Sequence, residues 1–483
     1  MSENLKPAPF PFIGPSYESR SRTFDSQRTL NMYLEVSDAG AGKGGQPALL
    51  LPTSGLKKVQ ELGTGPIRAT YTISNAQLSF VVSGNQVFQL SSAQGIAIAL
   101  AGNLNTSSGP VSIADNGAHV ILVDGVNGYT IDLATPALET IVDPNFYDGA
   151  KTVTYQGGYF ILEVAGTSNF FLSDIDSIDF LPLNESSAVT SPDVLVAVLS
   201  NNEQLYLLGQ RTFEVWALTG ASASAPFQLI SGRAFNMGCS APYTVRRIAG
   251  TFCWLGANDQ GDGVVYSMEN DSPTRISTHA IEFRLQQFGD LSTTTAFAYQ
   301  ENGHYFYALN LPSADTTYVY DLTAKQWHER QSFKEGVLGR HRGETHCFLN
   351  GNHIVGDYQD NRLYIYDQEH LYDDEEPIRR LRQTPHSSQD LANVFYKTMQ
   401  VDIQPGVGTV DINPRLVLRI SRDGGHTFGN PIYATAGLVG KYTTRARWQR
   451  LGKARDAVFQ VFCDDPAKVV FLSAYLDFEK GFA

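Results

Sequence analysis

The sequence predicts an all-β protein: a β-propeller of six or seven blades, followed by a small C-terminal β-sandwich, with an extended N-terminal arm. The 483 residues are 42% hydrophobic and 11% aromatic and include 43 Gly, a balance typical of strands joined by tight turns. Hairpin-like segments recur at regular spacing along most of the chain, and a separate group of alternating segments follows a charged stretch near the C-terminus. These observations predict two β domains.

Residues 1–60 are expected to form the extended arm and the entry to the first blade. Four prolines fall within residues 7–15, and residues 40–45 are rich in Gly. Both residue types disfavour regular structure in this part of the chain. Because an arm that buries few of its own residues is stable only against a neighbour, we expect it to take part in assembly.

Residues 61–372 are expected to form the propeller. Seven segments each read as an apolar run, a turn with Gly, Asn or Asp, and a second alternating run. They are residues 78–90, 119–133, 159–172, 204–218, 252–268, 304–320 and 353–366. Their starts lie about 40 to 52 residues apart, which is the length of a four-stranded propeller blade. Trp327 follows the sixth segment, where a kelch-like blade places a Trp between blades; an irregular set of hairpins is the alternative.

Residues 373–390 are expected to be a linker, and residues 391–483 the C-terminal sandwich or platform domain. The linker is predicted because an acidic run at 373–376 meets a basic, Pro-punctuated run at 379–385. Beyond it, four segments alternate as strands. They are residues 394–403, 416–421, 457–463 and 469–478.

The net charge of −13 is unevenly distributed along the chain. Residues 377–483 carry 15 Lys and Arg against 9 Asp and Glu, whereas residues 1–376 carry 21 against 40. An acidic body repels nucleic acid at long range, while a basic end can bind an acidic partner or phosphate. The two parts are therefore expected to face different surroundings.

Several function classes lack their sequence signatures. No apolar run reaches the roughly 18 residues that cross a bilayer, and residues 1–7 lack the apolar core of a signal peptide, so we expect no membrane-spanning segment and no export. The four Cys residues are scattered and are expected to be buried thiols. Glycines at 40, 42 and 45 match a dinucleotide fingerprint only in spacing, because no apolar strand precedes them. We predict no catalytic residue, cofactor or metal site.

One short motif matches the Asp box of sialidases and other propeller proteins. Its residues are Ser421, Asp423, Gly425, Thr427 and Phe428. In those proteins the box is a hairpin turn whose Asp accepts backbone N–H bonds and whose aromatic residue packs inward, away from the active site. The motif therefore predicts a turn, and the Arg triad and acid/base pair of a sialidase cannot be assigned in this sequence.

The densest basic cluster lies near the C-terminus and consists of Arg445, Arg447, Arg450, Lys453 and Arg455. Alternation along a strand places Arg445 and Arg447 on one face and Trp448 on the other. Three interpretations are open: a solvated strand edge that discourages aggregation, docking to an acidic neighbouring subunit, and phosphate contact with DNA. The five residues are our candidate subunit-docking residues.

Two regions resemble one protein family, and they occur in the same order. The first reads LGQRTFEVWALTGA over residues 208–221, and GCSAPY over 238–243 follows it. The second reads LRISRDGGHTFG over 418–429 and RARWQRLGKAR over 445–455. Both resemble the packaged DNA stabilisation protein, which is the tail hub or nozzle of short-tailed, podovirus-type bacteriophages.

The resemblance implies a structural virion protein of the tail, assembled in the host cytoplasm, and not an enzyme. It implies a ring of identical subunits, six in the related phages, below the portal and its head-to-tail adaptor. Such a ring retains packaged double-stranded DNA without sequence specificity, provides the ejection channel, and carries tailspikes or tail fibres and a needle or plug. We expect the acidic body to line that channel.

Two other classes of function compete with this one. The Asp box and the 23 Tyr residues suggest a propeller-type glycan-binding or glycan-hydrolysing phage receptor-binding protein, with a central pocket lined by Arg and carboxylates. A propeller scaffold in a cellular complex is equally compatible with an extended arm and an acidic body. The sequence names no host and no channel-lining residue.

Overall fold

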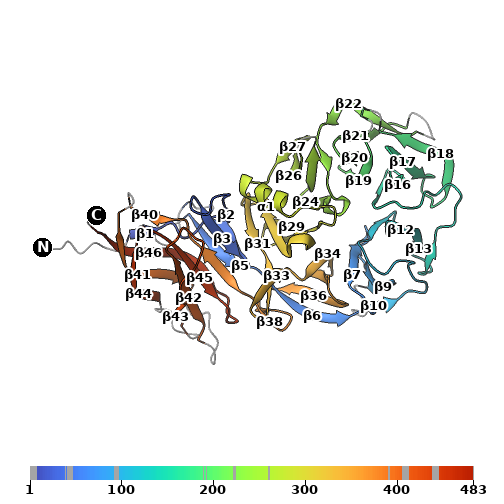
Figure 1. The fold of residues 1–483 in the computed structure, drawn as a ribbon. Coiled ribbons are helices and arrows are strands. Elements are labelled where there is room, and N and C mark those ends of the chain that lie inside the picture. Colours follow the sequence, from blue (N-terminus) through green and yellow to red (C-terminus); the bar gives the residue numbers. More distant parts are fainter. Residues whose placement is uncertain are drawn as a thin grey trace.

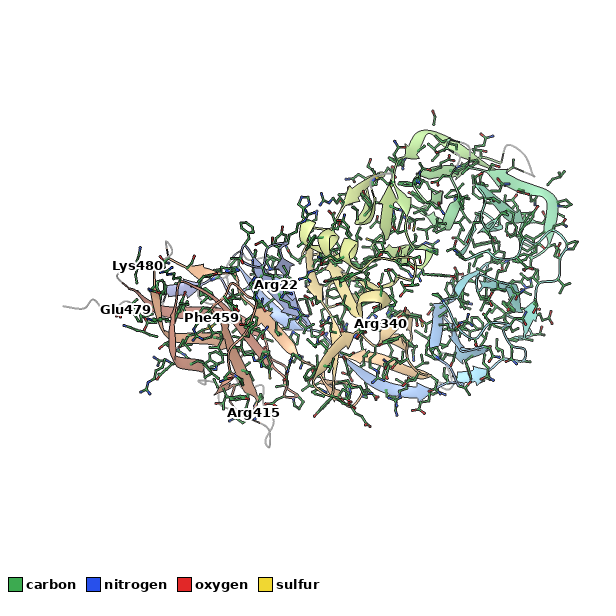
Figure 2. The ribbon with its side chains drawn as sticks, viewed as in Figure 1. Arg22, Arg340, Arg415, Phe459, Glu479 and Lys480 are labelled. Carbon is green, nitrogen blue, oxygen red and sulfur yellow. The ribbon has the colours of Figure 1, made fainter. Side chains whose placement is uncertain are left out.

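The computed structural model describes residues 8–37, 40, 47–91, 97–188, 190–191, 193–220, 225–258, 261–389, 392–404, 413–437 and 445–481. These residues form two bodies, a β-propeller and a β-sandwich, and the first and last described strands, residues 8–10 and 471–480, both lie in the sandwich (Figure 1). Phe459 lies inside the sandwich, whereas Glu479 and Lys480 lie at its end remote from the propeller (Figure 2).

Seven antiparallel sheets among the described residues form the blades of the propeller. Blade one contains β7 (Ile67–Thr72), β8 (Leu78–Ser83), β9 (Gln86–Ser91) and β10 (Ala97–Ala99). Blade two contains β11 (Ser112–Asp115), β12 (His119–Val123), β13 (Gly128–Asp132) and β14 (Leu138–Thr140). Blade three contains β15 (Val153–Gln156), β16 (Tyr159–Glu163), β17 (Asn169–Ser173) and β18 (Phe180–Ser187). Blade four contains β19 (Leu195–Asn201), β20 (Gln204–Gly209), β21 (Phe213–Leu218) and β22 (Phe227–Phe235).

Blades five, six and seven complete the propeller. Blade five contains β23 (Gly238–Cys239), β24 (Arg246–Ile248), β25 (Thr251–Asn258), β26 (Gly261–Glu269) and β27 (Ser272–Arg275). Blade six contains β28 (Thr295–Glu301), β29 (His304–Leu311), β30 (Thr316–Asp321) and β31 (Gln326–Glu329). Blade seven contains β34 (Gly343–Leu349), β35 (Asn352–Asp357), β36 (Arg362–Asp367) and β6 (Gly55–Glu61). Outside the blade sheets lie the helix α1 (His279–Gln287), the turns η2 (Pro242–Thr244) and η3 (Pro312–Ala314), and the hairpin of β32 (Gln331–Lys334) and β33 (Val337–Arg340).

Each of the seven predicted hairpins forms the two middle strands of one blade, so the propeller prediction is confirmed with seven blades. The turns within the hairpins explain why the sequence signal was readable. Gly84, Gly125 and Gly166, in the turns of the first three hairpins, have positive φ, a conformation that Gly adopts readily. Trp327 packs between blades as expected, because its Nε1 donates to the carbonyl of Ile276, 2.8 Å away, beside blade five.

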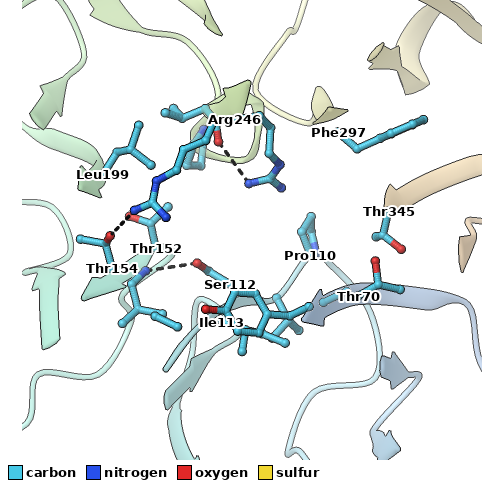
Figure 3. Close-up of a pocket in the computed structure, with 18 of the residues that line it drawn as sticks. Thr70, Pro110, Ser112, Ile113, Thr152, Thr154, Leu199, Arg246, Phe297 and Thr345 are labelled. Carbon is cyan, nitrogen blue, oxygen red and sulfur yellow. Dashed lines mark hydrogen bonds between the residues drawn. The ribbon is translucent and has the colours of Figure 1, made fainter. Parts of the chain in front are cut away.

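The propeller is closed by a strand from the N-terminal part of the chain. The strand β6 pairs antiparallel with β36 along the outer edge of blade seven, and the chain then continues directly into β7 of blade one. The innermost strands of the blades surround a central cavity (Figure 3). Closure therefore joins residues about 300 positions apart, as between Leu56 and Tyr366.

Two sheets form the C-terminal sandwich. The first contains β4 (Met32–Val36), β5 (Ala48–Pro52), β46 (Phe471–Lys480), β41 (Val394–Ile403) and β44 (Ala446–Ala454), with β1 (Ala8–Phe10) on β46. The second contains β3 (Ser26–Leu30), β39 (Arg380–Gln383), β45 (Asp456–Cys463), β42 (Arg415–Ser421) and β43 (Ile432–Thr435), with β2 (Tyr17–Glu18) on β3 and β40 (Ser387–Ser388) on β45. The four predicted strand segments correspond to β41, β42, β45 and β46.

The N-terminal segment is extended, but its described part packs onto this chain's own sandwich. Phe10, Phe12, Met32 and Leu50 are buried in the sandwich core, where the ring of Phe12 lies edge-on to that of Phe471 at 5.3 Å. The expectation that residues 1–60 form an arm with few buried residues is corrected for the described residues before 54, because these four side chains are buried within the chain, although Phe24 and Val36 remain exposed. Residues 55–61 form β6, which leads into the first blade as expected. Residues 1–7 and 41–46 lie outside the described residues.

The stretch expected to be a linker, residues 373–390, is structured through residue 389. The strands β37 (Tyr372–Asp373) and β38 (Glu376–Pro377) lie along β6, and β39 is a buried strand of the sandwich. Charge normally indicates solvent exposure, but Arg382 is fully buried because the carbonyls of Phe12 and Pro15 accept its N–H groups. The strand β3 pairs with both β31 and β39, so blade six and one sheet of the sandwich form a continuous sheet.

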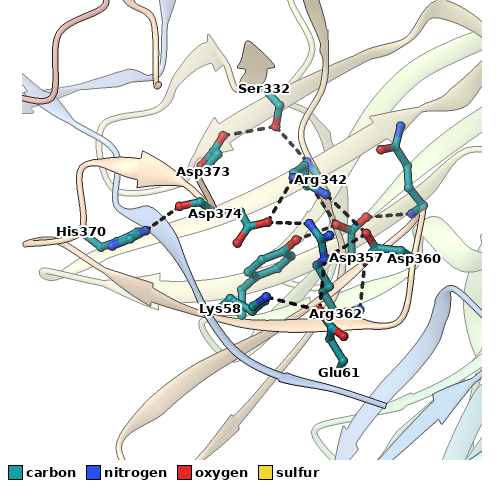
Figure 4. Close-up of polar contacts among 12 residues, drawn as sticks. Lys58, Glu61, Ser332, Arg342, Asp357, Asp360, Arg362, His370, Asp373 and Asp374 are labelled. Atoms are coloured by element: carbon teal, nitrogen blue, oxygen red, sulfur yellow. Dashed lines mark hydrogen bonds and ion pairs between the residues drawn. The ribbon is translucent and has the colours of Figure 1, made fainter. Parts of the chain in front are cut away.

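An ionic cluster holds the closing strand of the propeller (Figure 4). Arg342 approaches three carboxylates: Nε lies 2.9 Å from Asp357, and the terminal nitrogens lie 3.6 and 3.7 Å from Asp360 and Asp374. Asp374 also accepts a 2.6 Å hydrogen bond from Arg362 and donates its backbone N–H to Leu56 of β6. The cluster thus links β36, β6 and the segment that leaves the propeller.

We predict that Phe12→Ala lowers the free energy of unfolding by about 3–5 kcal/mol, because it leaves a cavity in the sandwich core. Phe24→Ala is the matched control, since Phe24 is 78% exposed and its loss should change stability by less than about 0.5 kcal/mol. Urea unfolding and differential scanning calorimetry measure both. Equal stability of the two variants would show that the N-terminal segment does not pack on the sandwich.

We predict that Arg342→Ala destabilises the propeller by about 3–5 kcal/mol, because the fully buried carboxylate of Asp357 loses its cationic partner. Lys58→Ala is the control: its pair with Glu61 is solvent-exposed and should contribute less than about 1 kcal/mol. Hydrogen exchange of the β6 amides should rise in the Arg342 variant alone. Unchanged exchange in β6 would contradict the role assigned to the cluster.

Candidate functional site

The five candidate docking residues lie on or beside the edge strand β44, and all are exposed. Along the strand, Ala446, Trp448, Leu451 and Ala454 are buried, which turns the intervening positions outward. Trp448 is held in the core, where its Nε1 donates to the carbonyl of Ile432 at 3.0 Å. The apolar residues of β44 therefore fix the strand while its cations face solvent.

The alternation along β44 is interrupted where the strand bends. Arg450 has a positive φ of 59° and Gly452 one of 88°, and the register against β41 shifts between Tyr396 and Thr398. Because of this irregularity, Gln449 and Arg450 are consecutive exposed residues. Local bulges of this kind reorient side chains and discourage edge-to-edge pairing of strands.

None of the five basic side chains forms an ion pair within the part of the chain that the structure describes. Other cations of the sandwich do: Arg379 makes a bidentate contact with Asp464 at 2.7 Å, and Lys397 pairs with Glu479. Five exposed cations without an ion pair among the described residues are thus gathered on and beside β44. This arrangement suits contact with an acidic or phosphate-bearing surface.

The Asp-box-like residues form the turn between β42 and β43. Asp423 accepts backbone N–H bonds from His426 at 3.1 Å and Thr427 at 2.9 Å, and Ser421 donates its hydroxyl to Asp423 at 2.7 Å. Gly425, whose φ is 85°, donates its N–H to Ser421 Oγ. The hydrogen bond from the Thr427 hydroxyl, followed by the backbone bonds, holds the pKa of Asp423 well below its usual range.

The Asp423 carboxylate is therefore occupied by its own turn. Phe428 is half-buried beside it. The turn lies in the sandwich, not in the propeller, and so it is remote from the central cavity. Its geometry assigns it a local structural role.

The central cavity of the propeller has a volume of about 460 Å³ and receives residues from the innermost strand of every blade. Its charged wall residues are Arg68, Arg246, Arg247, Asp115 and Glu344. Figure 3 shows Arg246 and Phe297 on one side of the cavity and Pro110, Ser112 and Ile113 on the other. The volume is that of a small-molecule pocket.

Sequence reasoning did not identify this cavity. Arg68, Asp115, Arg246 and Glu344 come from four different blades, so no local motif joins them. The one local signal is the pair Arg246–Arg247 within an otherwise apolar stretch. This pair of arginines could have been used to predict charged side chains on an innermost strand.

Within the described residues, no group of three or more His, Cys, Asp and Glu side chains is arranged to hold a metal ion. In the same part of the chain, no helix is long and apolar enough to cross a membrane. All four cysteines are free and buried, and burial raises the pKa of the Cys239, Cys253 and Cys463 thiols to about 12.

Comparison with solved structures returns other propellers. One is the WD40 domain of Pan2 from Neurospora crassa, 8% identical, which covers 63% of this chain and 89% of that one with a TM-score of 0.42. Another is the β-propeller domain of Cps50 (Swd1) from Myceliophteria thermophila, 8% identical, which covers 64% and 99% with a TM-score of 0.42. Similarity this distant does not indicate a shared function. A comparison with curated proteins gave no significant match.

Two family models match the chain in the order of its two domains. The model for the β-propeller of bacteriophage P22 Gp10 matches residues 9–371, and the model for the β-sandwich of the same protein matches residues 379–479. The families are those of phage structural proteins. Because the matched ranges cover almost the whole chain, it belongs to the bacteriophage P22 Gp10 family of DNA stabilisation proteins, the structural tail components of podovirus-type phages.

Proposed function

We propose that this chain forms the tail hub, or nozzle, as a closed ring of identical subunits, six by analogy with the related phages, below the portal and its head-to-tail adaptor. Family membership is the observation that carries this proposal. The continuous sheet between blade six and the sandwich supports it, because it makes each subunit a rigid block. Head-to-tail contacts between such blocks close a ring without two-fold symmetry.

In this proposal, DNA passes between the subunits and not through the propeller. A cavity of about 460 Å³ is in the size range of small ligands and cannot admit a duplex. Residues 1–376, with 40 acidic against 21 basic side chains, would line the channel of the ring. Like charge on the channel wall would let the packaged DNA slide without adhering during ejection.

The cations of β44 are proposed to dock on an acidic neighbouring subunit in the virion. The acidic propeller supplies a surface of the required sign in each copy of the chain. Exposed charges mainly speed and orient association, so this contact would guide assembly in the host cytoplasm. Tailspikes or tail fibres and the needle or plug would attach to other faces of the ring.

A receptor-binding role for glycans is the second candidate. It is favoured by the cavity, which is lined by arginines and carboxylates as that hypothesis expects. However, Asp115 and Glu344 are engaged by neighbouring side chains, and Glu344 by an ion pair with Arg340 at 2.8 Å. The tail-hub proposal therefore has the stronger support, and neither proposal requires a cofactor or catalysis.

The hub proposal predicts that the purified chain attaches as a ring at a single vertex of DNA-filled, tailless phage heads and reduces DNA leakage. Native mass spectrometry gives the subunit number before and after mixing, and electron microscopy locates the ring. A purified chain that does not attach to the heads but binds glycans on an array would instead support the receptor-binding role. A ring whose channel wall is neutral or basic would contradict the proposed lining.

The docking proposal predicts that the triple variant Arg445→Gln, Arg447→Gln, Arg450→Gln attaches to heads or to its own neighbours at least 10-fold more weakly, with unchanged thermal stability. Lys325→Gln with Lys334→Gln is the control, because both lysines are exposed on the propeller side. Association is measured at low and moderate salt, where the difference should shrink as ionic strength rises. Equal attachment of the two variants would assign the β44 cations to solubility alone.

A further inference from the structure

Two adjacent arginines of the central cavity have their side chains held in place by neighbouring blades. Arg246 donates from Nε to the carbonyl of Ala296 at 2.7 Å, in blade six. Arg247 donates from Nε to the carbonyl of Ser200 at 2.6 Å, in blade four, and from Nη2 to Thr154 Oγ1 at 3.3 Å, in blade three. Arg246 also donates from Nη1 to the carbonyl of Val245 at 3.2 Å, so each side chain is held by its Nε and by one terminal nitrogen, and the other terminal nitrogen is left for the cavity.

Neither arginine has an anionic partner among the described residues. The cavity's carboxylates are used elsewhere: Asp115 accepts from Tyr71 at 2.7 Å, and Glu344 accepts from Arg340 at 2.8 Å. The third arginine of the wall differs, because the carbonyls of Gly84, Thr106, Ser108 and Gly109 accept the N–H groups of Arg68. Arg246 and Arg247 are therefore the arginines of the wall whose terminal N–H groups are not all used by the described residues, while Asp115 is held by neutral donors.

The surroundings of Arg246 make an unpaired cation costly. It is half-buried, and burial lowers the pKa of its guanidinium, while the ionisable groups that act on it are Tyr307 and Tyr243. Tyrosine is uncharged near neutral pH, so the protein itself provides no compensating charge. A bound anion would supply it.

A hydroxyl of the wall adds a donor. The Thr345 and Thr70 hydroxyls have no hydrogen-bond partner in the described part of the chain but are closed off from solvent. Ser112 Oγ accepts from the N–H of Val153 at 3.2 Å, which leaves its own hydrogen available. In Figure 3 these three residues stand around the cavity that Arg246 enters.

We propose that the central cavity of the propeller binds a small oxyanion, a phosphate or a carboxylate, between the guanidinium groups of Arg246 and Arg247. Guanidinium groups bind planar carboxylates and phosphates through paired N–H bonds, and a volume of about 460 Å³ accommodates such a ligand with a small organic group attached. The site is independent of ring assembly, because every residue that forms it comes from one chain.

The test is titration calorimetry and thermal unfolding of the full chain with sodium phosphate, with disodium succinate and with sodium chloride at matched ionic strength. We expect saturable binding of phosphate or succinate and a rise in the melting temperature that chloride does not produce. Tighter binding of phosphate than of succinate would identify a phosphate ligand, and the reverse would identify a carboxylate ligand. Arg247→Gln should weaken binding at least 10-fold, and Arg247→Lys should retain part of it.

Lys325→Gln is the control, because it removes an exposed cation of the propeller that does not line the cavity and should leave the binding unchanged. If Arg246→Gln does not fold, Arg247→Gln and the comparison of salts still decide the question. Absence of saturable binding by the unmodified chain would overturn the proposal. Equal binding by the Arg247→Gln variant and the unmodified chain would overturn it as well, and would assign both arginines to contacts between blades.

Discussion

The contacts of Asn31 join the two domains. Its backbone N–H donates to the carbonyl of Glu329 at 2.8 Å, and its side-chain amide donates to the carbonyls of Gln331 and Arg379. Its Oδ1 also accepts the N–H of Gln331 at 2.9 Å. A single buried residue with a positive φ, which Asn tolerates better than most residues, thereby connects the end of blade six to the entry of the sandwich.

The same N-terminal segment completes both bodies. Its part before Asn31 supplies Phe10 and Phe12 to the sandwich core, and its part after Asn31 supplies β6 to blade seven. Arg28 adds a bidentate contact with Glu329, at 2.9 and 2.6 Å, beside the continuous sheet. Since neither domain is complete without this segment, folding of the propeller and of the sandwich should be coupled.

How much the sequence predicted depends on whether the signal was local. The hairpin at 304–320 was readable because alternation and turn residues lie within one stretch, and the sandwich strand at 394–403 was predicted with the bounds of β41. The placement of residues 8–37 was not predicted, because Phe12 contacts Phe471, which lies more than 450 positions away in the sequence. The linker prediction failed at Arg382, which was expected to be exposed, because its hydrogen-bond acceptors are carbonyls distant in the sequence that no pattern near residue 382 reveals. The cavity arginines share this difficulty.

The basic residues of this acidic chain differ in how their charge is compensated. Arg342 and Arg379 pair with carboxylates of their own chain and stabilise its fold. The β44 cations have no ion pair among the described residues but remain in water, where an unpaired charge costs little, so they suit a reversible contact that is steered over distance. Arg246 has no carboxylate partner in the same part of the chain and is half-buried, which is costly. A half-buried guanidinium favours a compensating anion more than a surface charge does, and this difference separates the proposed docking surface from the proposed anion site within one subunit.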